Sequence, residues 1–269
     1  MPITLDYHVH THLCKHATGD PMAYVRQAAE VGLREIGFSD HCPWPDGFDY
    51  RNRMRPDQFE CYKEIVAKAK DNPFGVTVRY GLEVDWVPGR MDEVFDSLRE
   101  EPLDYLIGSV HYTDNFAIDD PASIDEWKQE GVAERAWLRY AEVVAEMIRS
   151  GRFNIIGHLD LPKKFGFYPA SLEPFHERID SAFINAAATG MAVEINTSGL
   201  RKPVKETYPS LAILRMANRR GVALTFGSDS HSPGDVGKNF TEAGALAAAA
   251  GFTSYVGFDR RQPVSHALK

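Results

Sequence analysis

The stretch Leu5-Asp6-Tyr7-His8-Val9-His10-Thr11-His12 places polar side chains on one face of a predicted strand. Side chains alternate between faces along a strand, so Asp6, His8 and His10 point the same way, joined by His12 if the strand runs that far. Two histidines on one strand can hold one metal ion, with Asp6 orienting a ligand ring from behind. The stretch therefore predicts a metal site; the alternative is a solvated strand face that happens to carry histidines.

The composition is that of a globular protein. The chain has 269 residues, 43% of them hydrophobic, and no linker divides it, so we expect a single domain over residues 1–269. The net charge of −8 and the absence of a basic run argue against a nucleic-acid partner. No apolar run is long enough for a membrane span, and no signal peptide follows Met1. Three cysteines without a disulfide pattern indicate a reduced, cytoplasmic setting.

Predicted strands and helices alternate along the whole chain. The strands are expected at residues 5–12, 35–39, 76–84, 105–111, 154–157, 192–196, 222–227 and 255–258. Helices are expected at residues 21–32, 58–70, 91–98, 125–150, 173–189, 208–220 and 241–250. Such alternation predicts a parallel sheet, and this many units in one domain favour a closed barrel. An open doubly wound sheet is the alternative, but its usual glycine-rich phosphate fingerprint does not follow the first strand.

Metal-competent side chains stand at or just past the C-terminal ends of separate predicted strands. They are His8, His10, His41, Glu83, His111, His158, Asp229 and His231. In a parallel barrel these ends converge on one rim, where such enzymes carry their chemistry. His16, on the first loop, can join them, whereas His12, His176 and His266 lie outside the set. We therefore expect one metal centre, and we expect Cys14 and Cys42 not to bind metal because histidines and carboxylates already fill it.

This pattern resembles the polymerase and histidinol phosphatase (PHP) superfamily of metallophosphoesterases. The matching motifs are His8-Val9-His10-Thr11 with His16, Ser39-Asp40-His41, Glu83, His111, His158 and Asp229-Ser230-His231. Around them, residues 108–112, 157–164 and 196–201 are similar to the histidinol-phosphate phosphatase branch. The resemblance implies a distorted (βα)7 TIM-like barrel with its active site at the C-terminal ends of the strands and up to three divalent ions.

The resemblance also divides the ligands among three sites. The first would be formed by His8, His10, Glu83 and Asp229; the second by Glu83 as a bridge, His111 and His158; the third by His16, His41 and His231. Mixed imidazole and carboxylate ligands suit zinc, iron or manganese better than calcium or magnesium. We expect the ions to be of that kind.

The implied activity is hydrolysis of L-histidinol phosphate to L-histidinol and phosphate, in histidine biosynthesis. Two metals that share Glu83 would lower the pKa of a bridging water, and the resulting hydroxide would attack phosphorus in line. Asp40 is a candidate acid for the leaving oxygen, with metal-bound water as an equal rival. Two alternatives stay open: a nucleotide phosphatase or phosphodiesterase of the same superfamily, and a non-catalytic metal-binding accessory domain.

Basic residues are expected to complete a pocket for a small phosphomonoester. Arg201 follows a strand end and can form a bidentate pair with phosphate. Lys163 and, less favoured, Lys164 follow the strand that bears His158, and Arg53 lies on the loop after His41. A solvated surface charge is the alternative for each. The sequence leaves the oligomeric state open.

Overall fold

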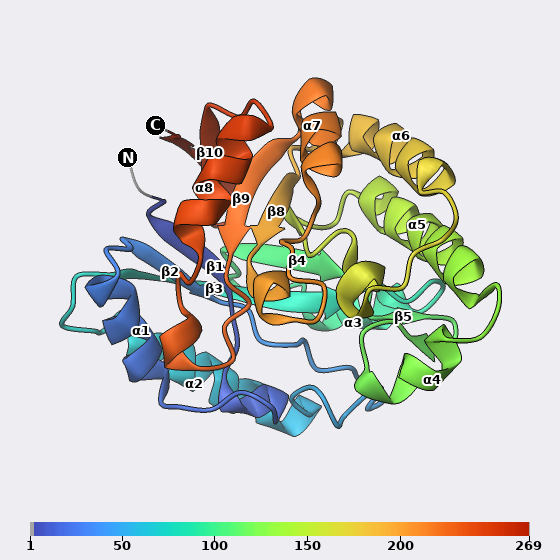
Figure 1. Cartoon of the computed structure of the whole chain (residues 1–269). Coiled ribbons are helices and arrows are strands. Elements are labelled where there is room, and N and C mark those ends of the chain that lie inside the picture. Colours follow the sequence, from blue (N-terminus) through green and yellow to red (C-terminus); the bar gives the residue numbers. More distant parts are fainter. Residues whose placement is uncertain (1–2, 269) are drawn as a thin grey trace.

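A computed structural model describes residues 3–268 of the chain, and its centre is a barrel of parallel strands (Figure 1). The seven-stranded sheet has the order β1-β2-β3-β4-β7-β8-β9, and every neighbouring pair is parallel. A further bridge between Val9 and Ser230 brings the two edges together. The strands are β1 (Leu5–Val9), β2 (Glu35–Phe38), β3 (Thr77–Asp85), β4 (Tyr105–Ser109), β7 (Ile155–Ile156), β8 (Ala192–Asn196) and β9 (Ala223–Gly227). The prediction of a (βα)7 barrel is confirmed.

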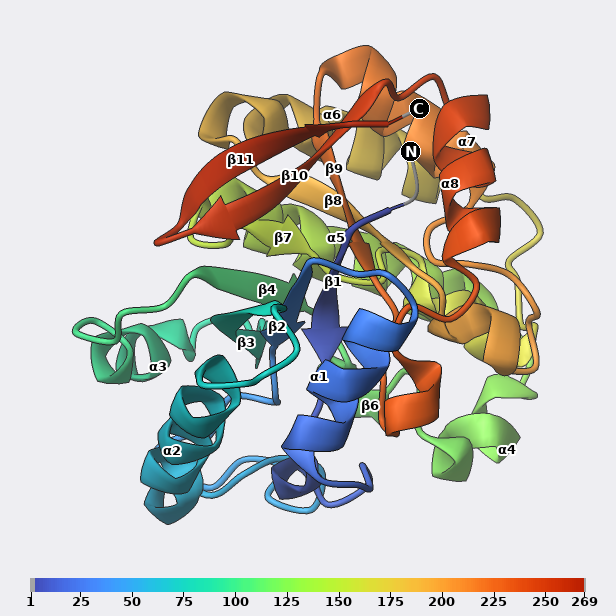
Figure 2. The same ribbon diagram turned by 90° about the vertical axis from the view of Figure 1, so that its left-hand side faces the viewer.

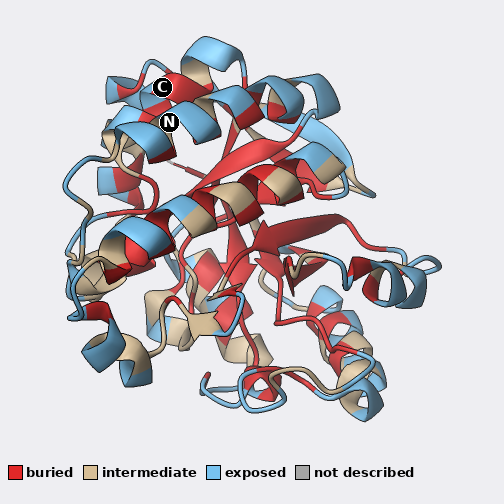
Figure 3. Ribbon diagram, turned by 90° about the vertical axis from the view of Figure 1, so that its right-hand side faces the viewer, coloured by how far each residue is buried: buried red, intermediate tan, exposed pale blue. Residues whose placement is uncertain are grey.

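Helices surround the barrel, with one face buried and the other exposed, as the colouring in Figure 3 shows. They are α1 (Pro21–Glu30), α2 (Phe59–Lys70), α3 (Met91–Ser97), α4 (Ile124–Trp127), α5 (Val132–Ser150), α6 (Glu173–Thr189), α7 (Leu211–Arg220) and α8 (Phe240–Ala249). Their apolar residues recur at helical spacing, so burying one stripe against the sheet leaves the polar stripe in water. Among the described helices, none is long and apolar enough to cross a membrane.

Three local expectations about the elements were wrong. The long helix expected at 125–150 is two helices, because Gly131 adopts φ 71° between α4 and α5, outside the helical region. The first strand ends at Val9, since the Thr11 side chain accepts a hydrogen bond from the Leu13 amide and starts a short 3-10 turn. His12 lies exposed on that turn.

The third difference is at the C-terminal end of the described chain. Instead of one short strand, β10 (Ser254–Asp259) and β11 (Gln262–Ala267) form an antiparallel hairpin beside the barrel (Figure 2). Most of β11 is exposed, so its sequence lacks the apolar alternation by which a half-buried strand is recognised. A second, smaller hairpin, β5 (Tyr112–Thr113) and β6 (Phe116–Ala117), follows β4.

Tyr105 fills the end of the barrel at which the strands begin. Its ring stacks on Tyr7 at 4.8 Å, and its hydroxyl donates to the Tyr7 carbonyl over 2.8 Å. A Cβ atom at Gly37 on β2 or Gly81 on β3 would overlap this ring, so glycine is required at both positions. This aromatic packing closes one end of the barrel, and the predicted metal ligands lie at the other.

Candidate metal centre

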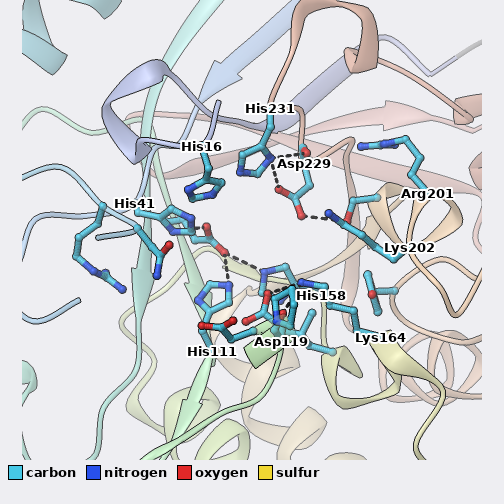
Figure 4. A pocket seen from close by; sticks show the side chains of 18 of the residues that line it. His16, His41, His111, Asp119, His158, Lys164, Arg201, Lys202, Asp229 and His231 are labelled. Atoms are coloured by element: carbon cyan, nitrogen blue, oxygen red, sulfur yellow. Dashed lines mark hydrogen bonds and ion pairs between the residues drawn. The ribbon is translucent and has the colours of Figure 1, made fainter. Parts of the chain in front are cut away.

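Predicted ligands from separate strand ends meet around one pocket, where Figure 4 shows His16, His41, His111, His158, Asp229 and His231. Glu83 lies among them. Its Oε2 atom is 2.9 Å from His41 Nδ1 and 3.3 Å from His8 Nε2. Its Oε1 atom is 3.0 Å from His158 Nε2 and 3.6 Å from His111 Nε2. His10 Nε2 is also 3.6 Å from Oε2. The Glu83 side chain is 1% exposed, so five imidazoles enclose one buried carboxylate.

Asp229 supplies a second carboxylate, just after β9. Its Oδ1 atom is 3.3 Å from His10 Nε2, 3.4 Å from His231 Nδ1 and 3.9 Å from His8 Nε2. Its Oδ2 atom accepts a hydrogen bond from Ser198 Oγ over 3.0 Å. The two carboxylates therefore share His8 and His10 between them, and Ser198 limits rotation of the Asp229 side chain.

The remaining imidazoles stack into one cluster beside Asp229. Ring centroids are 4.2 Å apart for His10 and His231, 4.6 Å for His16 and His231, and 4.5 Å for His10 and His41. Ligand atoms lie within 4.8 Å of one another in several sets, among them His10–His41–His231, His8–His10–Asp229 and His8–Glu83–His158. These sets share members, so the division into three separate sites stays a prediction.

Hydrogen bonds on the far side of the rings determine which nitrogen faces the centre. In each of four rings Nδ1 lies against an oxygen that can only accept, so Nδ1 carries the hydrogen and the Nε2 lone pair is free. The pairs are His8 with Glu194 Oε1 (2.7 Å), His111 with Asp85 Oδ1 (2.7 Å), His16 with the Cys14 carbonyl (2.8 Å) and His231 with the Asp229 carbonyl (3.1 Å). This is the tautomer that a metal ligand requires when Nε2 faces the ion.

Whether these residues fit a metal ion can be tested on the histidine nitrogens that face the centre. Among residues 3–268, the Nε2 atoms of His8, His10 and His231 are buried and have no hydrogen-bond partner. Buried polar atoms without partners are rare because each one costs free energy. Here they gather beside two carboxylates, and this donor set suits divalent transition metals. The residues present therefore fit the implied ions.

Burial and neighbouring charges shift the pKa values of the predicted ligands. Burial favours the neutral acid, yet the surrounding imidazoles hold the pKa values of Glu83 and Asp229 well below their ordinary range. Burial and neighbouring imidazoles lower the pKa of His16 to about 4 and that of His231 well below 6.5. The neighbouring carboxylates outweigh burial at three other rings: they raise the pKa of His8 well above 6.5, that of His10 to about 9 and that of His111 to about 10. Metal binds ionised carboxylates and neutral imidazoles, so an ion would replace the protons of these three rings.

A cavity of about 380 Å³ opens over these residues. Figure 4 shows Arg201 and Lys202 on one side of it, across from His16 and His41. Arg201 donates from Nη2 to the Ser228 carbonyl over 2.7 Å, which holds its guanidinium at the wall. The cavity thus has an imidazole-rich base, and its wall carries both cations and carboxylates, among the latter Asp49, Asp119, Asp120 and Asp235. Arg201 and Lys202 are the side chains there that suit an anionic ligand.

The lysines predicted for the phosphate pocket point to opposite sides of one turn. Lys163, with its side chain 2% exposed, is 2.9 Å from Asp160 and donates to the Thr207 carbonyl over 2.7 Å. It lines a different cavity. Lys164, the less favoured residue, lines the cavity over the metal centre and pairs with Asp119 at 2.9 Å. The structure therefore brings Lys164 to the site and not Lys163.

Two other predicted residues lie behind the ligands. Asp40 is fully buried and accepts hydrogen bonds from the Thr11 and His41 amides, while its Oδ1 is 3.5 Å from His10 Nδ1. It is placed to orient these residues rather than to reach a leaving group. Arg53 borders the cavity, but it is 2% exposed and its donors are directed to Asp85 and other acceptors.

The carboxylates that hold the ligand rings were not among the predicted residues, although the sequence carries a signal for them. Asp85 stands two residues after Glu83 on β3, and Glu194 stands two residues before Asn196 on β8, so strand alternation places each pair on one face. Asp6, expected behind a ring, instead accepts hydrogen bonds from the amides of Ser228 and Gly237, both at 2.9 Å. It holds the segment that carries Asp229.

Comparison with known proteins gives consistent matches over most of the chain. A family described as "PHP domain" matches residues 6–198. A Deinococcus radiodurans protein named "Probable histidinol-phosphatase" is 40% identical, over 88% of this chain and 90% of that protein. A Bacillus subtilis protein named "Histidinol-phosphatase" is 30% identical, over 86% of this chain and 95% of that protein.

A solved structure has the same fold. It is the histidinol phosphate phosphatase of Lactococcus lactis, which is described as complexed with zinc, L-histidinol and phosphate. The TM-score is 0.79 at 24% sequence identity, covering 97% of this chain and 98% of that one. At this identity the likeness shows the fold, a parallel barrel with its strands in the same arrangement.

Proposed function

The chain belongs to the PHP domain family, and we propose that it is a metal-dependent phosphatase that hydrolyses L-histidinol phosphate to L-histidinol and phosphate. The observation that carries this proposal is the convergence of imidazoles from separate strand ends on Glu83 and Asp229, beneath an open cavity whose wall includes cations. The names of the relatives at 40% and 30% identity support the choice of substrate. Zinc, iron or manganese would be the ion.

The residues that would hold the ions are those predicted from the sequence: His8, His10, His16, His41, Glu83, His111, His158, Asp229 and His231. When bound, such ions act as Lewis acids toward phosphoryl oxygens and lower the pKa of water, so that a nucleophile exists at neutral pH. The protein contributes fixed ring orientations and ionised carboxylates. Glu83 is the residue on which most ligands depend, because both of its oxygens face imidazoles.

Cationic side chains at the cavity wall would bind and orient the phosphate. Arg201 Nη1 and Nη2 donate to the carbonyls of Thr197 and Ser228, and each nitrogen has a second hydrogen with which it could donate to a phosphate oxygen. Lys164 and Lys202 add charge beside it. We assign Asp40 to orienting His10 and the His41 backbone, because it is buried behind them.

The same proposal covers the setting of the enzyme. The partner is a small phosphomonoester, and no nucleic-acid partner is proposed for a chain of net charge −8. Cys14, Cys42 and Cys61 are free thiols, which suits a cytoplasmic enzyme of biosynthesis. We further propose that residues 1–269 form one domain, since the described buried residues form one hydrophobic cluster.

A substrate panel tests the activity. The purified protein, loaded in turn with zinc, manganese and iron, is assayed with L-histidinol phosphate, nucleoside bisphosphates and p-nitrophenyl phosphate. The proposal expects kcat/KM for L-histidinol phosphate to exceed the others by on the order of 100-fold. A preference for nucleotides would support the nucleotide phosphatase alternative, and no turnover with any metal would support an accessory metal-binding role.

A further inference from the structure

The guanidinium of Arg53 is buried at the cavity wall, with both of its Nη atoms hydrogen-bonded to the protein. It is 2% exposed, and Nη2 donates to Asp85 Oδ2 over 2.7 Å and to Asp49 Oδ2 over 3.1 Å. Nη1 donates to the Cys42 carbonyl over 3.3 Å, and Nε has no partner among the described residues. A phosphate in the cavity would have to displace these acceptors to reach Arg53.

The shortest of these bonds continues to a predicted metal ligand. The other oxygen of Asp85, Oδ1, accepts from His111 Nδ1 over 2.7 Å and from the His111 amide over 3.2 Å. His111 Nε2 then lies 3.6 Å from Glu83 Oε1, at the centre of the site. Arg53, Asp85 and His111 therefore form a continuous chain from the loop after β2 to the metal centre.

Aromatic packing holds the start of this chain in place. The Phe48 ring lies 5.2 Å from Arg53 Cζ on one side and 5.0 Å from Arg90 Cζ on another. The edge of Tyr112, the residue after His111, packs against Phe48 with ring centroids 5.2 Å apart. The loop thus contacts both the carboxylate that holds His111 and the residue that follows it.

Arg53 provides the positive charge that the buried carboxylate of Asp85 requires. Asp85 is 1% exposed, and a buried carboxylate is stable only when its oxygens are paired. Because Arg53 binds Asp85 Oδ2, the Asp85 side chain cannot rotate. Asp85 Oδ1 therefore stays against His111 Nδ1 and fixes the orientation and tautomer of that ring. Without Arg53, Asp85 would have a free oxygen and could rotate away from the ring.

We propose that Arg53 is a positioning residue, which binds Asp85 and through it orients His111 for metal binding, and that it does not bind the phosphate of the substrate. This inference rests on the proposed metal-dependent function of the site. It concerns metal and phosphate affinities, so it can be tested without knowledge of the organic part of the substrate.

The test compares Arg53→Gln and Arg53→Lys with Arg55→Gln as the matched control. Arg55 lies two residues further on, half-exposed and paired with Asp57. Zinc affinity is measured by chelator competition, bound zinc by elemental analysis, and inorganic phosphate affinity by titration of the zinc-saturated protein. Arg53→Gln is expected to weaken zinc binding about 10–100-fold, as for other residues that hold a ligand. Phosphate affinity should stay within about twofold, since Arg53 makes no phosphate contact.

Arg53→Lys should fall between Arg53→Gln and the wild type, because an ammonium keeps the charge beside Asp85 but cannot span both acceptors. Arg55→Gln should change neither affinity. An unchanged zinc affinity with a loss of phosphate affinity of about tenfold or more would instead make Arg53 a phosphate ligand and overturn the proposal.

A double-mutant cycle separates positioning from a general loss of stability. If Arg53 acts through Asp85, the Arg53→Gln/Asp85→Asn protein should bind zinc about as weakly as Asp85→Asn alone. Additive losses would overturn the proposal. Should Arg53→Gln fail to fold, the Arg53→Lys cycle with Asp85→Asn carries the same comparison. A protein that binds zinc and phosphate as described, yet does not hydrolyse L-histidinol phosphate, would refute the proposed function and leave this inference standing.

Discussion

Glu194 on β8 holds His8 on β1, with Glu194 Oε1 2.7 Å from His8 Nδ1 and both side chains buried. The other oxygen of Glu194 accepts a hydrogen bond from the His158 amide over 3.0 Å. One carboxylate therefore fixes the ring of one predicted ligand and the backbone of another, although the three residues come from β8, β1 and the segment just after β7. The residues that orient the predicted ligands therefore come from separate parts of the barrel, as the ligands do.

Glu194→Gln is expected to lower zinc affinity by about 10–100-fold, because an amide has one acceptor oxygen and cannot serve both His8 and His158. Chelator competition measures the loss, and circular dichroism checks that the variant is folded. Glu206→Gln is the control, since that side chain is 54% exposed and lies outside the metal centre. Equal zinc affinity in Glu194→Gln and the wild type would remove Glu194 from this role.

Gly227→Ala is expected to disrupt the same pair by sterics. A Cβ at this position would overlap Glu194 Oε1 and the Cβ of His8. Both are buried and cannot move freely, so we expect a loss of about 1–3 kcal/mol in the free energy of unfolding together with weaker zinc binding. Gly234→Ala is the control, because a Cβ there meets no neighbouring atom within 4 Å. Thermal unfolding of the two metal-free variants and their zinc affinities provide the comparison.

Glu83→Ala is expected to abolish most metal binding and nearly all turnover. The carboxylate is the shared neighbour of His8, His41, His111 and His158, and its removal leaves these imidazoles without a charge to balance a cation. Elemental analysis and phosphatase assays measure both effects. A variant that retained its metal and its rate would contradict the central position of Glu83.

Arg201→Ala and Lys164→Ala are expected to raise KM and the inhibition constant for inorganic phosphate by about tenfold, while metal content stays the same. Both side chains line the cavity, and neither is among the predicted metal ligands. The measurement is steady-state kinetics on metal-saturated protein, beside elemental analysis. An unchanged KM and inhibition constant would exclude the residue concerned from the phosphate pocket.

Lys163→Ala should show the opposite pattern. It would leave the buried carboxylate of Asp160 without its ion-pair partner, so we expect a loss of about 3 kcal/mol in the free energy of unfolding. KM should change little, because Lys163 lines a different cavity. Denaturant unfolding and the kinetic assay on the same preparation test both halves. A large rise in KM with an unchanged free energy of unfolding would instead show that Lys163 binds the phosphate.

The barrel and the place of its polar residues could be predicted because they follow from periodic patterns. Alternating strands and helices lead to a parallel sheet, and parallel strands end on one rim. His41, Glu83, His111 and His158 therefore meet although long stretches of sequence separate them. The errors in element boundaries were local: Gly131 divides a helix, and Thr11 ends the first strand early. The conformation of a single residue can end an element although the hydrophobic pattern of the sequence continues past it.

The amino-acid sequence by itself determined the barrel, the rim and the residue types gathered there, because strand order and alternation place those side chains whatever their rotamers. Only the tertiary structure decided what stands behind the ligands: that Arg53 turns to Asp85, and that Lys163 and Lys164 face different cavities. These choices depend on the side-chain rotamers and packing of loops and short 3-10 turns, where no repeating pattern specifies direction.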